Sequence, residues 1–129
     1  MLALIVARPG PVCDGLVALL GASPDVRKIV QVARAEDAWD FVQSICPDLT
    51  LIYDSPLTSD IANLISQMKA SCGWPVLIIV NSEEDRQTAV AHDADVVVME
   101  GLPSSKLAAQ IISLLQQSED KQGKNVIHR

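Results

Sequence analysis

Residues 76–80 read VLIIV, five consecutive apolar side chains that decide how this chain folds. Successive side chains of a β-strand point to opposite faces, so an unbroken apolar run of this length predicts a strand covered on both sides. Residues 2–6 (LALIV) and 96–99 (VVVM) are runs of the same kind. Residues 49–53 (LTLIY) and 28–32 (KIVQV) complete the predicted strands, and the polar side chains of KIVQV favour an edge position.

Helical patterns separate these runs. Apolar residues recur at spacings of three and four, which places them on one face of a helix. The apolar stripes run through residues 12–20, 38–45, 61–68 and 107–115, and a weaker helical segment covers residues 83–92. The weaker segment is almost without apolar residues, although Ser82 with Asp85 at its start is typical of a helix cap. We interpret His92, at the end of that segment, as a solvated helix terminus.

The alternation of strands with helices sets the fold class. Each strand, helix and following strand predicts a right-handed crossover between parallel strands. The sequence therefore predicts an α/β fold, a doubly wound five-stranded parallel sheet in three layers with helices on both faces. We assign residues 1–117 to this domain. Residues 118–129 turn polar and lose their periodicity, which predicts a helix extension or a flexible C-terminal tail.

The composition and charge of the chain bear on its partners, its thiols and its location. The chain has 129 residues, 49% of them hydrophobic, and a formal net charge of −6, so we expect no direct nucleic-acid partner and no membrane partner. Cys13, Cys46 and Cys72 are widely spaced, which predicts reduced thiols rather than a disulfide or a zinc site. The apolar run at residues 2–6 is too short for a membrane span and lacks a basic leader. These features predict a cytoplasmic protein.

Five segments together resemble the receiver domain of bacterial two-component response regulators, of the type that precedes a helix-turn-helix output domain. In chain order they are LIVARPGPVCDGLVALL, ARAEDAWDFV, PDLTLIYDSPL, WPVLIIVNSEED and HDADVVVMEGLPSSKLAAQI. The combination of PDLTLI, PVLIIV and ADVVVM is more specific than any one piece. The resemblance covers residues 2–115 and implies the CheY-like, flavodoxin-like strand order 2-1-3-4-5.

The resemblance also implies where chemistry is expected. In that family, two acidic residues after the first strand bind Mg²⁺, and an Asp at the end of the third accepts a phosphoryl group. A hydroxyl after the fourth strand and a Lys after the fifth contact the phosphate. The matching positions in this chain are Ala7, Arg8, Tyr53, Val80 and Glu100. A divalent cation needs oxygen ligands and an acyl phosphate needs a carboxylate, so we expect no metal, no cofactor and no enzymatic activity.

Two further expectations concern this degenerate pocket. Arg8 and Glu100 reverse the charges that the family places there, which leads to the hypothesis that they form an ion pair, with two independent surface charges as the alternative. Asp54 directly follows Tyr53 and is the possible atypical phosphoacceptor. Because neighbouring strand residues point to opposite sides, we favour a capping role for Asp54 at the following turn or helix.

The predicted function is a pseudo-receiver, a signalling module that lacks the phosphoacceptor site and acts through contacts with a protein partner or a second copy. The aromatic switch position of the family falls on Val97. The resemblance implies an interaction face on the fourth helix, fifth strand and fifth helix, with residues Gln87, Ala91, Val97, Glu100 and Lys106. One alternative is a response regulator that is phosphorylated at Asp54. A second is a small-ligand or nucleotide-binding domain with Arg8 as anion clamp.

Overall fold

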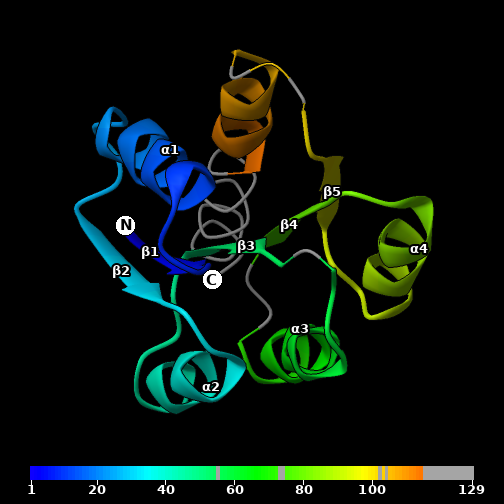
Figure 1. The fold of residues 1–129 in the computed structure, drawn as a ribbon. Coiled ribbons are helices and arrows are strands. Elements are labelled where there is room, and N and C mark those ends of the chain that lie inside the picture. The colour runs from blue at the N-terminus through cyan, green and yellow to red at the C-terminus, as the bar shows by residue number, and fades with distance from the viewer. Residues whose placement is uncertain (55, 73–74, 102, 104, 115–129) are drawn as a thin grey trace, which may run out of the picture.

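The computed structural model describes residues 1–54, 56–72, 75–101, 103 and 105–114 (Figure 1). The strands are β1 (Leu2–Val6), β2 (Lys28–Val32), β3 (Leu49–Tyr53), β4 (Val76–Val80) and β5 (Val96–Met99). The helices are α1 (Pro11–Gly21), α2 (Ala35–Ser44), α3 (Ser59–Ser71), α4 (Glu83–Ala91) and a further helix at residues 105–114. All five strands have the predicted bounds. The predicted domain boundary after residue 117 lies outside the described residues.

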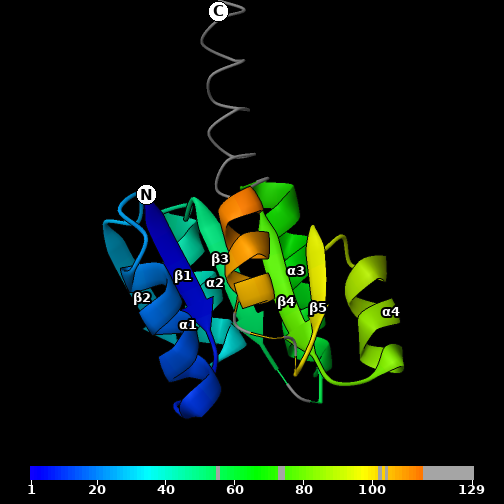
Figure 2. The same cartoon turned by 90° about the horizontal axis from the view of Figure 1, so that it is seen from above.

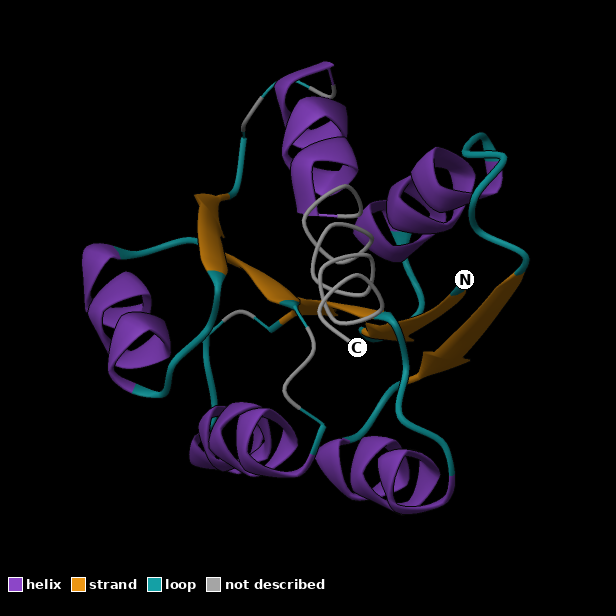
Figure 3. Cartoon of the chain, turned by 180° about the vertical axis from the view of Figure 1, so that it is seen from behind, coloured by secondary structure: helices purple, strands orange, loops and turns teal. Residues whose placement is uncertain are grey.

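The strands form one parallel sheet in the order β2-β1-β3-β4-β5, which confirms the predicted fold and strand order. Helix α1 and helix 105–114 cover one face, and α2, α3 and α4 cover the other (Figure 1). Figure 2 shows the sheet between these two layers, and Figure 3 shows the same arrangement from behind. None of the helices in the described part of the chain is both long and apolar enough to cross a membrane.

The burial of β1 explains the unbroken apolar runs. Ala3 and Ile5 belong to the apolar cluster beneath α1 and helix 105–114, whereas Leu4 and Val6 belong to the cluster beneath the other three helices. Every residue of β4 is buried as well. In β2, which lies at the edge of the sheet, no residue is fully buried. The prediction that KIVQV is an edge strand is therefore confirmed.

Helix α4 begins as predicted. The Ser82 hydroxyl accepts a hydrogen bond from the Asp85 amide at 3.1 Å, which satisfies one of the amides left over at a helix start. Ala89 is the one buried residue within this helix, so its apolar face is as small as the sequence predicts. The end of the helix differs from the prediction: His92 is half-buried, and its Nδ1 lies 2.7 Å from the Ser66 hydroxyl of α3. It fits against α3 because the two helices pack side by side (Figure 1).

The chain leaves α4 through Asp93, which has a φ of 69°. The Asp93 amide donates to the Val90 carbonyl and the Ala94 amide donates to the Ala89 carbonyl, the pair of bonds that closes a Schellman motif. Glycine adopts this left-handed conformation without the steric cost that a side chain brings. The Asp93→Gly substitution is therefore expected to raise the free energy of unfolding by about 0.5 kcal/mol.

Chemical denaturation of the parent and the variant measures that difference. Asp40→Gly is the matched control, because Asp40 lies inside α2, where the same substitution is expected to cost about 1 kcal/mol. Equal destabilisation by both substitutions would contradict the role assigned to Asp93.

The cysteines do not behave as the sequence predicts. Cys46 and Cys72 form a disulfide with a Cα–Cα distance of 5.7 Å, so the prediction of three reduced thiols is wrong for this pair. Cys46 follows the end of α2 and Cys72 caps the end of α3, and these two helices pack against each other. The pairing depends on this tertiary placement, which the 26-residue separation in the sequence does not reveal. Since disulfides persist mainly in oxidising compartments, the cytoplasmic location stays a prediction.

Cys13 is the free thiol, and it lies on the buried face of α1. Burial raises the pKa of the Cys13 thiol, and the neighbouring Asp14 carboxylate raises it further. Because the thiolate is the reactive form, we expect the non-reduced native protein to resist iodoacetamide at neutral pH and to take up one label once denatured. Intact-mass analysis before and after denaturation measures this. Rapid labelling of the native protein would show that Cys13 is accessible.

Candidate functional site

The carboxyl ends of the strands bring the five predicted pocket positions to one edge of the sheet. Ala7 follows β1 and is 2% exposed, and Val80 ends β4 and is fully buried. Neither side chain offers an oxygen or nitrogen atom. Glu100 follows β5, and its amide donates to the Val80 carbonyl at 2.7 Å. The end of β4 is therefore held against the residue that follows β5.

Tyr53 and Glu100 meet across this edge. The Tyr53 hydroxyl donates a hydrogen bond of 2.5 Å to the Glu100 Oε1. In receiver domains the resemblance places a phosphoacceptor carboxylate and a lysine at these two positions. In this chain Tyr53 places a phenol at the acceptor position, and Glu100 places a carboxylate where the family has the lysine. A hydrogen bond to a charged carboxylate is among the stronger kinds, so it fixes the Tyr53 side chain towards β5.

The hypothesis of an Arg8–Glu100 ion pair is wrong. Glu100 lines an apolar groove between α1 and helix 105–114, whereas Arg8 lines a cavity on the side of α2 and α3. The side chains of Arg8 and Glu100 thus lie on opposite faces of the sheet. Within the described ranges, Arg8 forms no ion pair. Tyr53 is the partner of Glu100 that the sequence analysis missed, and an aromatic hydroxyl at the end of the central strand was the available signal.

Asp54 caps the segment that leads into α3. Its Oδ2 accepts hydrogen bonds from the Thr58 amide at 2.8 Å and from the Thr58 hydroxyl at 3.0 Å. The same hydroxyl of Thr58 then accepts a bond from the Ile61 amide at 3.3 Å and so caps α3. The chain of bonds runs from Asp54 through Thr58 into the first turn of the helix. One oxygen of the Asp54 carboxylate is thereby used to hold the local backbone.

Metal-binding groups do not gather at this edge. The described residues contain no group of three or more His, Cys, Asp or Glu side chains that could hold a metal ion. Of the side-chain oxygens that follow the strand ends, those of Tyr53 and Glu100 bond to each other, and that of Asp54 bonds to Thr58. A cation such as Mg²⁺ needs several oxygen ligands around one point. The residue types described here do not supply that set.

The predicted interaction face lies over α4, β5 and the start of helix 105–114. Gln87, Ala91, Glu100 and Lys106 are exposed, whereas Val97 is half-buried against the apolar cluster beneath α4. The structure adds two exposed apolar side chains that sequence reasoning missed. They are Val90 of α4, which is 52% exposed, and Met99 of β5, which is 41% exposed.

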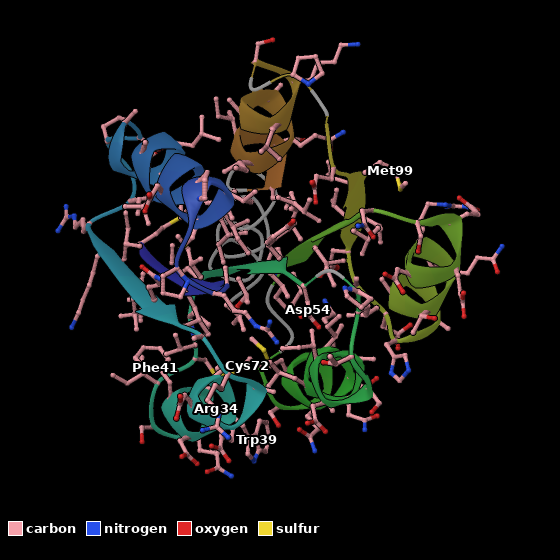
Figure 4. The ribbon with its side chains drawn as sticks, viewed as in Figure 1. Arg34, Trp39, Phe41, Asp54, Cys72 and Met99 are labelled. Atoms are coloured by element: carbon pink, nitrogen blue, oxygen red, sulfur yellow. A yellow bond between two sulfur atoms is a disulfide. The ribbon has the colours of Figure 1, made fainter. Side chains whose placement is uncertain are left out.

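Figure 4 shows Met99 at the edge of the sheet on the side of α4. Both residues stand out in the sequence, because Val90 is the one large apolar residue of α4 and Met99 ends an otherwise β-branched run. These differences from the neighbouring residues were the sequence signal for Val90 and Met99.

Comparison with known proteins places the fold. No family model matches the sequence, and no curated protein matches it. A CheY-like response regulator receiver domain from Methanospirillum hungatei is 17% identical, with a TM-score of 0.78 over 93% of this chain and 97% of that one. The signal receiver domain of a DNA-binding response regulator from Colwellia psychrerythraea is 20% identical, with a TM-score of 0.75 over 90% and 98%. An orphan response regulator of H. pylori is 17% identical, with a TM-score of 0.73 over 89% and 96%.

These solved structures and the strand order agree. The chain has the fold of response regulator receiver domains, and the match spans nearly the whole length of the receiver domains themselves. At such low identity the likeness concerns the fold. The site must therefore be argued from the residues of this chain.

Proposed function

We propose that this chain is a pseudo-receiver, a signalling module that acts by contacts with another protein and does so without phosphorylation. The observation that carries the proposal is the 2.5 Å hydrogen bond between Tyr53 and Glu100. It occupies the position where a receiver would hold a phosphoryl group, and it does so with a phenol and a carboxylate. Buried Ala7 and Val80 supply neither metal ligands nor a hydroxyl.

Charge supports the same proposal. A phosphoryl group entering this edge would meet the Glu100 carboxylate and the Asp54 carboxylate with no lysine at the family position. Transfer to a carboxylate depends on a cation that offsets the charge of the phosphoryl group. Arg8 carries a positive charge, but its guanidinium cannot bind Mg²⁺. The residues therefore favour a fixed conformation over a phosphorylation switch.

The test is incubation with acetyl phosphate and Mg²⁺, followed by intact-mass analysis. We expect no phosphoryl adduct on the parent chain. An adduct that disappears in Asp54→Asn but persists in Asp60→Asn would overturn the proposal and support the alternative, a response regulator phosphorylated at Asp54. Asp60 is the matched control because it is an exposed carboxylate in the first turn of α3.

The face formed by α4 and β5 is the proposed contact surface. It carries Val90 and Met99, two exposed apolar side chains on an edge whose strand has one neighbour in the sheet. Exposed apolar residues surrounded by polar ones are typical of regulated rather than permanent protein contacts. Gln87 and Lys106 supply polar groups around them.

A second copy of the chain is the first partner to test. Sedimentation equilibrium of the parent chain is expected to show reversible association that Val90→Glu and Met99→Glu abolish. Ile45→Glu is the control, since Ile45 is 50% exposed and lies beyond α2, away from this face. Equal loss of association in the control would place the contact elsewhere, and a strictly monomeric parent chain would exclude the homodimer.

A further inference from the structure

An open cavity of about 540 Å³ lies at the edge of the sheet beside α2 and α3. Its lining includes Val6 and Arg8 from β1 and the residues after it, Tyr53 and Asp54 from the end of β3, and Trp39 of α2. Pockets that bind small molecules have volumes of roughly 300–1,000 Å³. The cavity is therefore large enough for a ligand of one or two rings.

The topology places this cavity where the fold favours ligands. In doubly wound parallel sheets, ligands bind outside the carboxyl ends of the strands, where the strand order reverses. For the order β2-β1-β3-β4-β5, that point lies between β1 and β3. The cavity is lined by residues at the ends of these two strands. Two independent observations, the volume and the topology, thus indicate the same place.

The charges around the cavity determine which ligand fits. Arg34 forms an ion pair of 3.0 Å with Glu36, so these two charges offset each other. Asp54 accepts two hydrogen bonds from Thr58. Asp60 is exposed on the first turn of α3. Arg8 remains as the cation that has no ionic partner among the described residues.

Part of the cavity lining is apolar or aromatic. Trp39 is half-buried, and Figure 4 shows it on the side of α2 that faces α3. Ile61 and Leu64 of α3 line the same cavity and are buried. A planar ring placed against the half-buried indole of Trp39 removes apolar surface of both rings from water. A cation and an aromatic side chain in the lining of one cavity can together orient an amphipathic small molecule.

We propose that this cavity binds a small aromatic anion, with its carboxylate or phosphate on the Arg8 guanidinium and its ring against Trp39. Arg8 offers a planar set of donors that suits either anionic group. The ring is required, since the carboxylates of Asp54 and Asp60 reduce the attraction for an anion alone. This inference goes beyond the proposed function, and neither depends on the other.

The experiment is an amide chemical-shift titration of the full chain with four probes: phenyl phosphate, benzoate, inorganic phosphate and benzyl alcohol. We expect phenyl phosphate or benzoate to bind saturably at millimolar concentration, with shifts centred on residues that line the cavity. Inorganic phosphate and benzyl alcohol, which each lack one of the two features, are expected to bind at least about tenfold more weakly. Comparison of the first two probes distinguishes a phosphate site from a carboxylate site.

Two variants make the result decisive. Arg8→Gln is expected to weaken binding of the aromatic anion about tenfold or more, because it removes a charge-assisted contact. Arg27→Gln is the matched control, an exposed arginine outside the cavity lining, and is expected to leave binding unchanged. The proposal is overturned if neither aromatic anion binds saturably, or if both variants change the affinity equally. Self-association of the chain is a separate measurement that these outcomes do not affect.

Discussion

Replacing Cys46 and Cys72 by serine is expected to lower the free energy of unfolding by about 3.5 kcal/mol. The bond closes a segment of the chain with a sequence separation of 26 residues. Its main effect is on the unfolded chain, which has fewer conformations available when two distant positions are joined. The native structure loses little, because both sulfur positions lie at helix ends outside the two apolar clusters that fill the core. Cys72 contacts one of those clusters only as a partly buried neighbour.

Denaturant titration with and without a reductant measures this effect. The parent chain is expected to lose stability when dithiothreitol is added, and the double serine variant is expected to be insensitive to it. Ser71→Ala is the matched control for a substitution at the end of α3, and we expect it to change stability by less than about 0.5 kcal/mol. If the reductant left the parent chain unchanged, the bond would contribute nothing in solution.

The location of the chain bears on this result. Cytosolic thiols are kept reduced, so in the cytoplasm the pair would contribute its stabilisation only after oxidation. Trapping of free thiols in intact cells, followed by mass analysis, reports the state directly. The result would also test the predicted cytoplasmic location.

The strands β1, β3 and β4 were predictable because they are buried on both faces. Residues 76–80 have no polar side chain, and all five are buried between helices. Such a run is incompatible with a surface position, and it needs no knowledge of its neighbours to be recognised. The edge strand β2 was equally readable, since Lys28 and Gln31 are exposed where no further strand covers them.

The pairing within the pocket was not predictable from residue types alone. Arg8 and Glu100 have opposite charges, which suggested a bond between them. In the sheet, however, β1 and β5 are three strand spacings apart, about 14 Å, whereas β3 and β5 are two spacings apart, about 10 Å. Tyr53, with its long side chain at the end of β3, therefore reaches Glu100 first. Distance across the sheet decided the partner, and charge did not.

Replacing Asp95 by alanine is expected to destabilise the protein by about 2 kcal/mol. Asp95 precedes β5, and its Oδ2 accepts a hydrogen bond of 2.8 Å from the Val76 amide at the start of β4. The same carboxylate binds Lys69 of α3, with Nζ–O distances of 2.8 and 3.0 Å. One side chain thus joins two strands and a helix. Its removal leaves a partly buried amide without its side-chain acceptor.

The Asp95→Asn variant separates the two contributions. Its amide oxygen can still accept from Val76, but it has no charge for Lys69, so about half of the loss is expected, about 1 kcal/mol. The control is Asp40→Ala, which removes an exposed carboxylate inside α2 and is expected to change stability by less than about 0.5 kcal/mol. Urea denaturation of the four proteins gives the differences. If alanine and asparagine cost the same at Asp95, the bond to the β4 amide contributes little, and the charge on Lys69 accounts for the effect.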